Sequence, residues 1–267
     1  QAIKHAIGTG EFREGAGTSE RVDLLDRYVA DLAGRFDLSR PVKIVLDCGN
    51  GVGSLVGVEL LEALGAEVVP LYCESDGTFP NHHPDPTVDE YLVDLIDTVR
   101  LEGAELGIGF DGDADRIGAV DENGQIVRGD LLLLLFGLDI LRLRGPGQKL
   151  VFDVKCSQVV SDEFSRAGGE AIMWKTGHSY IKRKVKKEKA LAGFEKSGHF
   201  FFNKPVGLGY DDGIFSAIQV CKLLDKIFPK KISILLNEIP KTYQSPTMAP
   251  YCSDSEKYKV VDVITKK

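Results

Sequence analysis

The chain has 267 residues, of which 43% are hydrophobic and 27% are charged, and its net charge at pH 7 is −7. This length suits two domains with ample apolar material for their cores, and the negative charge argues against nucleic acid as the main partner. No apolar run is long enough to cross a membrane. The five cysteines are odd in number and lack metal-binding spacing, so we expect reduced thiols in a cytoplasmic protein.

The clearest pattern along the chain is a repeat of strand, helix and strand. Both copies begin with a short apolar strand, continue with a helical stretch and close with a second strand, over residues 43–47, 54–64 and 67–71 and again over 149–153, 157–166 and 170–174. Helices between short buried strands are typical of βαβ units in sheets with a parallel component. The repeat therefore predicts an α/β fold with two related domains and mixed sheets.

Three alternating glycines, Gly49, Gly51 and Gly53, follow the first strand. They suggest part of a dinucleotide-binding fingerprint, but Val56 stands where the third glycine of that motif belongs. A tight turn from strand to helix accounts for the same glycines, and we favour this structural interpretation.

The most informative motif is the run Asp111-Gly-Asp113-Ala-Asp115-Arg116, named here the aspartate loop (residues 111–116), which follows an apolar strand over residues 106–110. In extended backbone, alternate side chains point the same way, so the three carboxylates should converge. Neighbouring negative charges repel unless a cation lies between them, and oxygen ligands suit Mg²⁺. We therefore expect Asp111, Asp113 and Asp115 to bind Mg²⁺.

Two other interpretations of the aspartate loop fit its sequence less well. A helix-loop-helix calcium site needs glycine at its sixth position, where this chain has Arg116, and the flanking segments resemble strands rather than helices. The second alternative is a solvated acidic turn that binds no metal. Metal binding is the favoured hypothesis.

A helix is expected over residues 130–143, and the turn-rich segment 144–148 follows it. We therefore predict a first domain over residues 1–143 and a second over 144–242. Residues 243–267, with a helix-like stretch over 255–266, are expected to be the truncated start of a third element. The chain begins without Met and ends without a clear terminal element, which suggests a piece of a longer protein.

Polar residues of the second half gather at three places. Lys155 follows the strand over 149–153, where open α/β sheets place their ligands, and His178 and Ser179 begin a helix. Lys155 and His178 would supply positive charge for a phosphate. The basic run over residues 182–189 on the same helix is more often a solvated face than a ligand site.

The third place is a short segment in which Glu195, Ser197 and His199 alternate. Alternate residues can share one face, and these three offer donors and acceptors that suit sugar hydroxyls. His199 is the better candidate for a base because a carboxylate lies four residues away.

Taken together, these motifs resemble the α-D-phosphohexomutases, and within them the phosphomannomutase/phosphoglucomutase branch, over essentially the whole chain. The aspartate loop resembles the family's metal loop, and residues 194–199 resemble its sugar-specificity loop. Residues 176–179 and Lys155 match positions that contact the substrate. Residues 79–86 and 209–213 are further family signatures, which we expect to be structural.

The resemblance implies the following site. Mg²⁺ would be the cofactor, bound by Asp111, Asp113 and Asp115. The catalytic residues would be Arg116, Lys155 and His199, and the substrate-binding residues would be His178, Ser179, Glu195, Ser197 and His199. The implied reaction of carbohydrate metabolism is reversible transfer of phosphate between the 1- and 6-positions of glucose or mannose phosphate, through a phosphoserine and a bisphosphorylated sugar.

Members of this family have four domains, and the resemblance places this chain on the second, the third and the start of the fourth. We therefore expect it to lack the first domain, which carries the phosphoserine, and the fourth domain's phosphate loop, and to be inactive alone. Alternatives are an N-acetylglucosamine-phosphate mutase, which typically has Gln where this chain has Lys196, a phosphatase with an Asp nucleophile, and a module that binds sugar phosphate without turnover.

Overall fold

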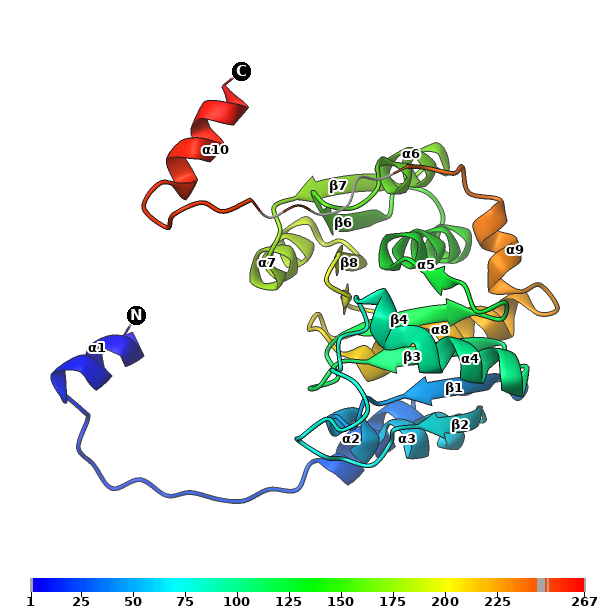
Figure 1. Cartoon of the computed structure of the whole chain (residues 1–267), viewed down its shortest axis with the longest axis horizontal. Coiled ribbons are helices and arrows are strands. Elements are labelled where there is room, and N and C mark those ends of the chain that lie inside the picture. Colours follow the sequence, from blue (N-terminus) through cyan, green and yellow to red (C-terminus); the bar gives the residue numbers. More distant parts are fainter. Residues whose placement is uncertain (1, 244–247, 249, 267) are drawn as a thin grey trace.

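The computed structural model describes residues 2–243, 248 and 250–266, and it contains two β-sheets, one above the other in Figure 1. Sheet A has the strand order β2-β1-β3-β4-β5, and sheet B has the order β7-β6-β8-β9. Their bounds are β1 (Lys43–Asp47), β2 (Glu67–Leu71), β3 (Leu106–Phe110), β4 (Ile117–Asp121), β5 (Ile126–Val127), β6 (Lys149–Asp153), β7 (Glu170–Trp174), β8 (Ala192–Glu195) and β9 (His199–Phe202).

The two sheets share one topology. In sheet A, β1 pairs in parallel with β2 and β3, and β4 runs antiparallel to β3. In sheet B, β6 pairs in parallel with β7 and β8, and β9 runs antiparallel to β8. The prediction of two related α/β domains with mixed sheets is therefore confirmed. The five strands predicted over 43–47, 67–71, 106–110, 149–153 and 170–174 form at those residues.

Most of the helices pack on the sheets, and the first and the last lie away from them (Figure 1). The longest are α5 (Gly129–Arg144) and α8 (Gly213–Ile227), and the others are α1 (Ala2–Thr9), α2 (Leu25–Ala33), α3 (Gly57–Ala63), α4 (Val93–Glu102), α6 (Gln158–Arg166), α7 (His178–Glu188), α9 (Ile232–Asn237) and α10 (Lys257–Thr265), with 3₁₀ turns η1 (Val52–Leu55) and η2 (Asp89–Leu92). The helix predicted over 54–64 is thus divided at Val56 into η1 and α3. No helix among the described residues has the length and apolar character that crossing a membrane requires.

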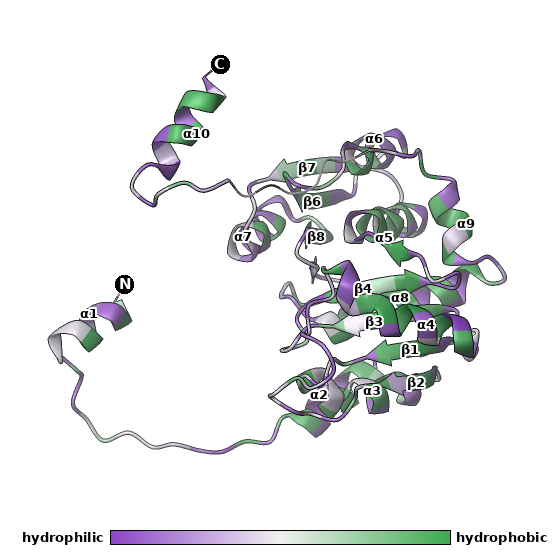
Figure 2. Ribbon diagram, in the orientation of Figure 1, coloured by the Kyte–Doolittle hydropathy of each residue, from purple (hydrophilic) through white to green (hydrophobic). Residues whose placement is uncertain are grey.

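One hydrophobic core joins the two sheets. It includes Leu46 and Ile108 from sheet A, Leu134 from α5, and Phe152 and Phe200 from sheet B. Strands and α5 carry much of the hydrophobic colouring in Figure 2. Helix α5 packs on both β4 and β8, and α8 packs on both β4 and β9. These two helices therefore connect sheet A to sheet B.

Both terminal helices, α1 and α10, bury no residues. The helix predicted over residues 255–266 corresponds to α10. Residues 244–247, 249 and 267 of the predicted third element lie outside the described residues. The division of the chain after residues 143 and 242 stays a prediction.

Candidate functional site

The aspartate loop is a tight turn at the end of β3. Ala114 has a φ of 59°, and the backbone N–H of Ala114 donates to the carbonyl of Asp111 over 3.1 Å. The three carboxylates converge, with ligand atoms of Asp111, Asp113 and Asp115 all within 4.8 Å of one another. The expected extended backbone was wrong, because a left-handed residue and a turn bring the carboxylates together instead.

Two neighbouring segments clamp the backbone of this loop. The Val52 N–H donates to the Gly112 carbonyl over 3.0 Å, and the Gly213 N–H donates to the Ala114 carbonyl over 2.9 Å. A Cβ on Gly51 would lie 2.7 Å from the Gly112 carbonyl oxygen, and one on Gly213 equally close to that of Ala114. The glycine turn after β1 therefore has a packing role, as the structural interpretation of the sequence expected.

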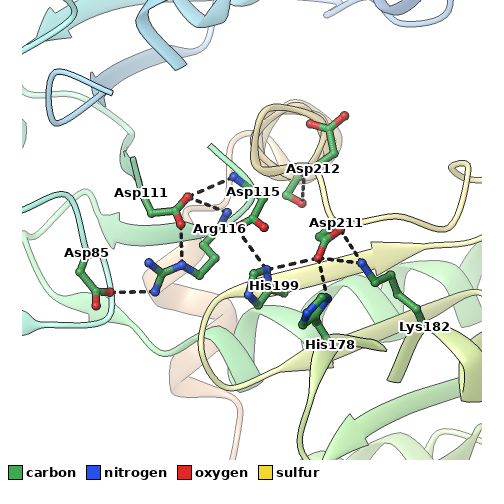
Figure 3. Close-up of polar contacts among 10 residues, drawn as sticks. Asp85, Asp111, Asp115, Arg116, His178, Lys182, His199, Asp211 and Asp212 are labelled. Carbon is green, nitrogen blue, oxygen red and sulfur yellow. Dashed lines mark hydrogen bonds and ion pairs between the residues drawn. The ribbon is translucent and has the colours of Figure 1, made fainter. Parts of the chain in front are cut away.

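Asp111 is the buried anchor of the loop. Its Oδ1 accepts hydrogen bonds from the backbone N–H groups of Asp115 and Arg116 at 3.1 and 3.0 Å. Its Oδ2 lies 2.6 Å from Arg116 Nε, and Arg116 Nη1 lies 3.0 Å from Asp85 Oδ1 (Figure 3). Arg116 is thus held between two carboxylates, one of which, Asp85, belongs to the segment 79–86 that the sequence pattern assigned to structure.

The surroundings of Asp115 raise the pKa of its carboxyl group. Burial first, and then the charges of Asp111, Asp113 and Asp211, raise the pKa of Asp115 to about 7. Asp113 is exposed, so one carboxylate of the set faces solvent. Three converging carboxylates form an all-oxygen donor set, which fits a hard divalent cation such as Mg²⁺.

Glu195 and His199 belong to a hairpin rather than to one extended segment. They face each other across β8 and β9, and Lys196, Ser197 and Gly198 form the turn between them, named here with its flanks the 195–199 hairpin. Directly opposed residues share a face of the sheet, so Glu195 and His199 do lie together, for a reason that differs from the predicted alternation.

Several polar atoms of this hairpin are buried and make no hydrogen bond. Among the described residues, Glu195 Oε2, Ser197 Oγ and His199 Nδ1 have no hydrogen-bond partner. Buried polar groups are normally paired, so such a group calls for an explanation. Hydroxyl groups of a bound ligand would provide partners for Glu195 Oε2 and Ser197 Oγ, whereas His199 Nδ1 faces two carboxylates, Asp115 and Asp211.

The 195–199 hairpin lies against the aspartate loop. The Gly198 carbonyl accepts a hydrogen bond from the Ile117 N–H at 3.2 Å, and His199 Nδ1 is 3.4 Å from Asp115 Oδ1. Burial lowers the pKa of His199, while the charges of Asp211 and Glu195 act in the opposite direction. The fold therefore places the predicted metal ligands and the predicted sugar loop side by side.

Asp211 is the residue that sequence reasoning missed most clearly. Its Oδ2 lies 3.6 Å from the Nδ1 atoms of both His178 and His199, and its two oxygens accept hydrogen bonds from Lys182 Nζ at 2.9 and 3.1 Å (Figure 3). The sequence signal is the pair of aspartates before α8. Asp212 caps this helix by accepting from the Phe215 N–H, so Asp211 is not needed for the cap. A second aspartate beside a sufficient cap is available for another contact.

The remaining predicted residues, Lys155 and Ser179, are exposed. Lys155 is exposed in the turn after β6, and its N–H donates to Asp153, which also accepts from Thr176 Oγ1. The buried Asp153 thus connects the Lys155 turn to the segment that precedes His178. Ser179 is exposed on the first turn of α7, and no contact between its side chain and the other predicted site residues is found among the described residues.

Comparisons with known proteins place these features in one family. Residues 26–124 match the family description Phosphoglucomutase/phosphomannomutase, alpha/beta/alpha domain II, and residues 128–243 match alpha/beta/alpha domain III. The second match begins before α5, whereas the sequence pattern placed the domain boundary after this helix.

Individual relatives agree with this result. The chain is 42% identical over 266 residues to a phosphomannomutase/phosphoglucomutase of Pseudomonas putida, covering 100% of this chain and 57% of that protein. It is 41% identical to a phosphoglucomutase of Neisseria meningitidis, covering 94% of this chain and 54% of the relative. A solved phosphoglucomutase/phosphomannomutase family structure from Burkholderia thailandensis superposes with a TM-score of 0.86 at 40% identity, over 91% of this chain and 52% of that one. The chain therefore spans a little over half the length of these relatives.

Proposed function

Because the chain belongs to the phosphoglucomutase/phosphomannomutase family, we propose that it supplies the metal-binding and sugar-binding residues of a hexose-phosphate mutase. The reaction would move a phosphoryl group between the 1- and 6-positions of glucose or mannose phosphate, through a phosphoserine and a bisphosphorylated sugar. The observation that carries the proposal is the contact between the aspartate loop and the 195–199 hairpin, where His199 Nδ1 lies 3.4 Å from Asp115 Oδ1.

Asp111, Asp113 and Asp115 would hold Mg²⁺. When bound, the ion would supply positive charge beside the phosphoryl oxygens during transfer. Burial is the main cause of the raised pKa of Asp115, and the charges of Asp111 and Asp113 add to it. A cation bound between the three carboxylates would relieve this added repulsion. Arg116, already held by Asp111 and Asp85, would present a fixed positive charge to the phosphate.

Glu195 and Ser197 would bind the sugar. Their unpartnered buried oxygens would pair with ring hydroxyls, which orients the hexose relative to the aspartate loop. The same hydroxyl contacts can serve a substrate bound in either direction, as a reaction at both ends of the sugar requires. His178 and Lys155 would lie toward the phosphate that is not transferred.

His199 is the better-placed residue to hold or move the proton of the attacking hydroxyl. It lies between Asp115 and Asp211, whereas Lys155 is exposed in the turn after β6. Asp211 would orient both His178 and His199.

The five cysteines are free thiols, which supports a cytoplasmic location, and fractionation of the source cells would test this location.

The test is calorimetric titration of the 267-residue chain with Mg²⁺, and with glucose 1-phosphate and mannose 1-phosphate in its presence. Asp113→Asn removes an exposed ligand and should weaken Mg²⁺ binding at least about tenfold without unfolding the chain. Glu195→Gln keeps the side-chain shape and should weaken sugar-phosphate binding about tenfold, since hydrogen bonds to a charged group are the stronger kind. Asp97→Asn, on the exposed side of α4, is the matched control.

The outcomes separate the competing hypotheses. Mg²⁺ binding that survives Asp113→Asn unchanged would refute the metal assignment. Loss of Mg²⁺ binding in Glu195→Gln would contradict the proposed division of roles. Release of inorganic phosphate from either sugar phosphate would favour a phosphatase over a mutase.

A further inference from the structure

A basic pocket that shares no residue with the site described above lies between the end of the edge strand β7 and helix α7. It has a volume of about 360 Å³ and is lined by two aromatic residues and four cations: Trp174, Lys175, Tyr180, Arg183, Lys184 and Lys187. No carboxylate belongs to this lining, and none of these residues is part of the aspartate loop or the 195–199 hairpin. Helix α7 contributes residues to both the pocket and the site described above, because its His178 and Lys182 contact Asp211 and do not line the pocket.

The positive charge of this pocket is largely uncompensated. Lys184 pairs with Glu188 at 2.7 Å. Within the part of the chain that the structure describes, Lys175, Arg183 and Lys187 have no carboxylate at ion-pair distance. The whole chain has a net charge of −7, so this concentration of cations is a local feature. A hollow lined by one sign of charge attracts and concentrates ions of the opposite sign.

The aromatic rings position the cations without neutralising them. Lys175 Nζ lies 3.8 Å from the centre of the Tyr180 ring, and Arg183 Cζ lies 5.2 Å from the same ring. Lys184 Nζ lies 4.3 Å from the centre of the Trp174 ring. Cation–π contacts of this kind hold an ammonium or guanidinium group in place while its charge stays available to an anion.

We propose that this pocket binds a compact polyphosphate, either inorganic pyrophosphate or the polyphosphate tail of a nucleotide. Two or more phosphoryl groups present enough oxygens to reach several cations at once, and a guanidinium such as Arg183 matches phosphate in two-point contacts. A pocket of this volume is within the range of small-molecule sites. The proposal goes beyond the mutase function and does not depend on it.

The chain offers a direct reporter, because Trp174 is its only tryptophan and Lys184 lies over its ring. An anion that draws Lys184 away from the ring should change the tryptophan fluorescence. The titration uses the 267-residue chain in EDTA at an ionic strength of about 0.15 M, where charges more than about 8 Å apart are largely screened, with pyrophosphate, orthophosphate and ATP as probes. We expect a saturable signal with pyrophosphate and at least about tenfold weaker binding of orthophosphate, a difference of about 1.4 kcal/mol.

The decisive comparison uses two double variants that remove the same charge. Lys175→Gln with Arg183→Gln changes the lining and should raise the Kd for pyrophosphate at least about tenfold. Lys186→Gln with Lys189→Gln changes exposed residues outside the lining and should raise it less than about threefold, as screened charges at a distance do. Circular dichroism checks that all variants fold.

Each outcome has a defined meaning. No saturable response to pyrophosphate or ATP would overturn the proposal, and so would equal weakening by the two double variants, since that indicates only diffuse attraction. Equal or tighter binding of pyrophosphate relative to ATP would assign the site to inorganic phosphates. Tighter binding of ATP, sensitive to the lining variants, would assign it to nucleotides.

Discussion

The pairing of His82 with Asp47 should make the stability of the fold depend on pH. Asp47 is 1% exposed, and its Oδ2 lies 3.0 Å from His82 Nε2, while its Oδ1 accepts from the Gly49 N–H at 2.8 Å. The hydrogen bond to Asp47 is the main cause that raises the pKa of His82 to about 8. This pair attaches the segment 79–86, which carries Asp85, to the end of β1.

The raised pKa of His82 determines in which direction the stability of the fold changes with pH. The folded chain binds the imidazole proton more tightly than the unfolded chain, so the stabilisation is fully present below about pH 6.5 and is lost as pH rises through about 8. A shift from 6.5 to about 8, at about 1.4 kcal/mol per unit, gives an upper value of about 2 kcal/mol. Water reaches the ring, whose side chain is 13% exposed, so we expect about 1 to 2 kcal/mol.

Urea unfolding followed by circular dichroism between pH 6 and pH 9 measures this effect. The free energy of unfolding of the natural chain should exceed that of His82→Gln by more at pH 6 than at pH 9, and the excess should shrink by about 1 to 2 kcal/mol. Comparing the two chains cancels other groups that titrate in this range, among them Asp115. His5→Gln, at an exposed histidine, is the control. Parallel pH profiles for the natural chain and His82→Gln would refute the reasoning.

Two further predictions concern the site. Gly51→Ala places a Cβ against the Gly112 carbonyl and should displace the aspartate loop, so calorimetry should record at least about tenfold weaker Mg²⁺ binding. The control is Gly15→Ala, where nothing lies within 4 Å of the added Cβ, and this variant should bind Mg²⁺ as before. Unchanged Mg²⁺ binding in Gly51→Ala would contradict the proposed clamping of the aspartate loop. Asp211→Asn should weaken sugar-phosphate binding about tenfold with little loss of thermal stability, because it removes the charge that faces His178 and His199. Asp212→Ala should instead lower stability by about 1 to 2 kcal/mol, because it removes the helix cap and the hydrogen bond that Asp212 accepts from the Tyr28 hydroxyl. The reverse pattern would show that the two roles are misassigned.

Strands β1, β2, β3, β6 and β7 could be predicted to the residue because each is a short apolar run bounded by turn residues, a purely local signal. The hairpin strands β8 and β9 were not predicted. The helix over 54–64 could not, since its division depends on a residue far along the chain. Gly53 and Gly57 pack directly against the Phe110 ring at the end of β3, and the backbone bends at Val56 between them. Close packing between segments overrides local helix propensity here.

The candidate site, too, could be predicted only as far as local sequence patterns reach. Residues 111–116 and 195–199 could be singled out from their residue types alone, but the turn and the hairpin that they form, and the partners that hold them, could not. Asp85 reaches Arg116 from 31 positions away, and Asp211 meets Asp115 and His199 because α8, which follows Asp211, packs on both β4 and β9. Both residues lie in segments whose sequence suggested structure, because a motif shows which residues are present and not what they contact.

The graded burial of the three aspartates decides which of them gives the clearest test of metal binding. Asp111 is 2% exposed and accepts hydrogen bonds from two backbone N–H groups and from Arg116. Asp111→Asn would therefore weaken the turn and release Arg116, and lost binding would have two explanations. Asp113 is exposed, and the described residues provide it with no hydrogen-bond donor. Since the fold makes little use of this carboxylate, a loss of Mg²⁺ binding in Asp113→Asn reports on the metal itself.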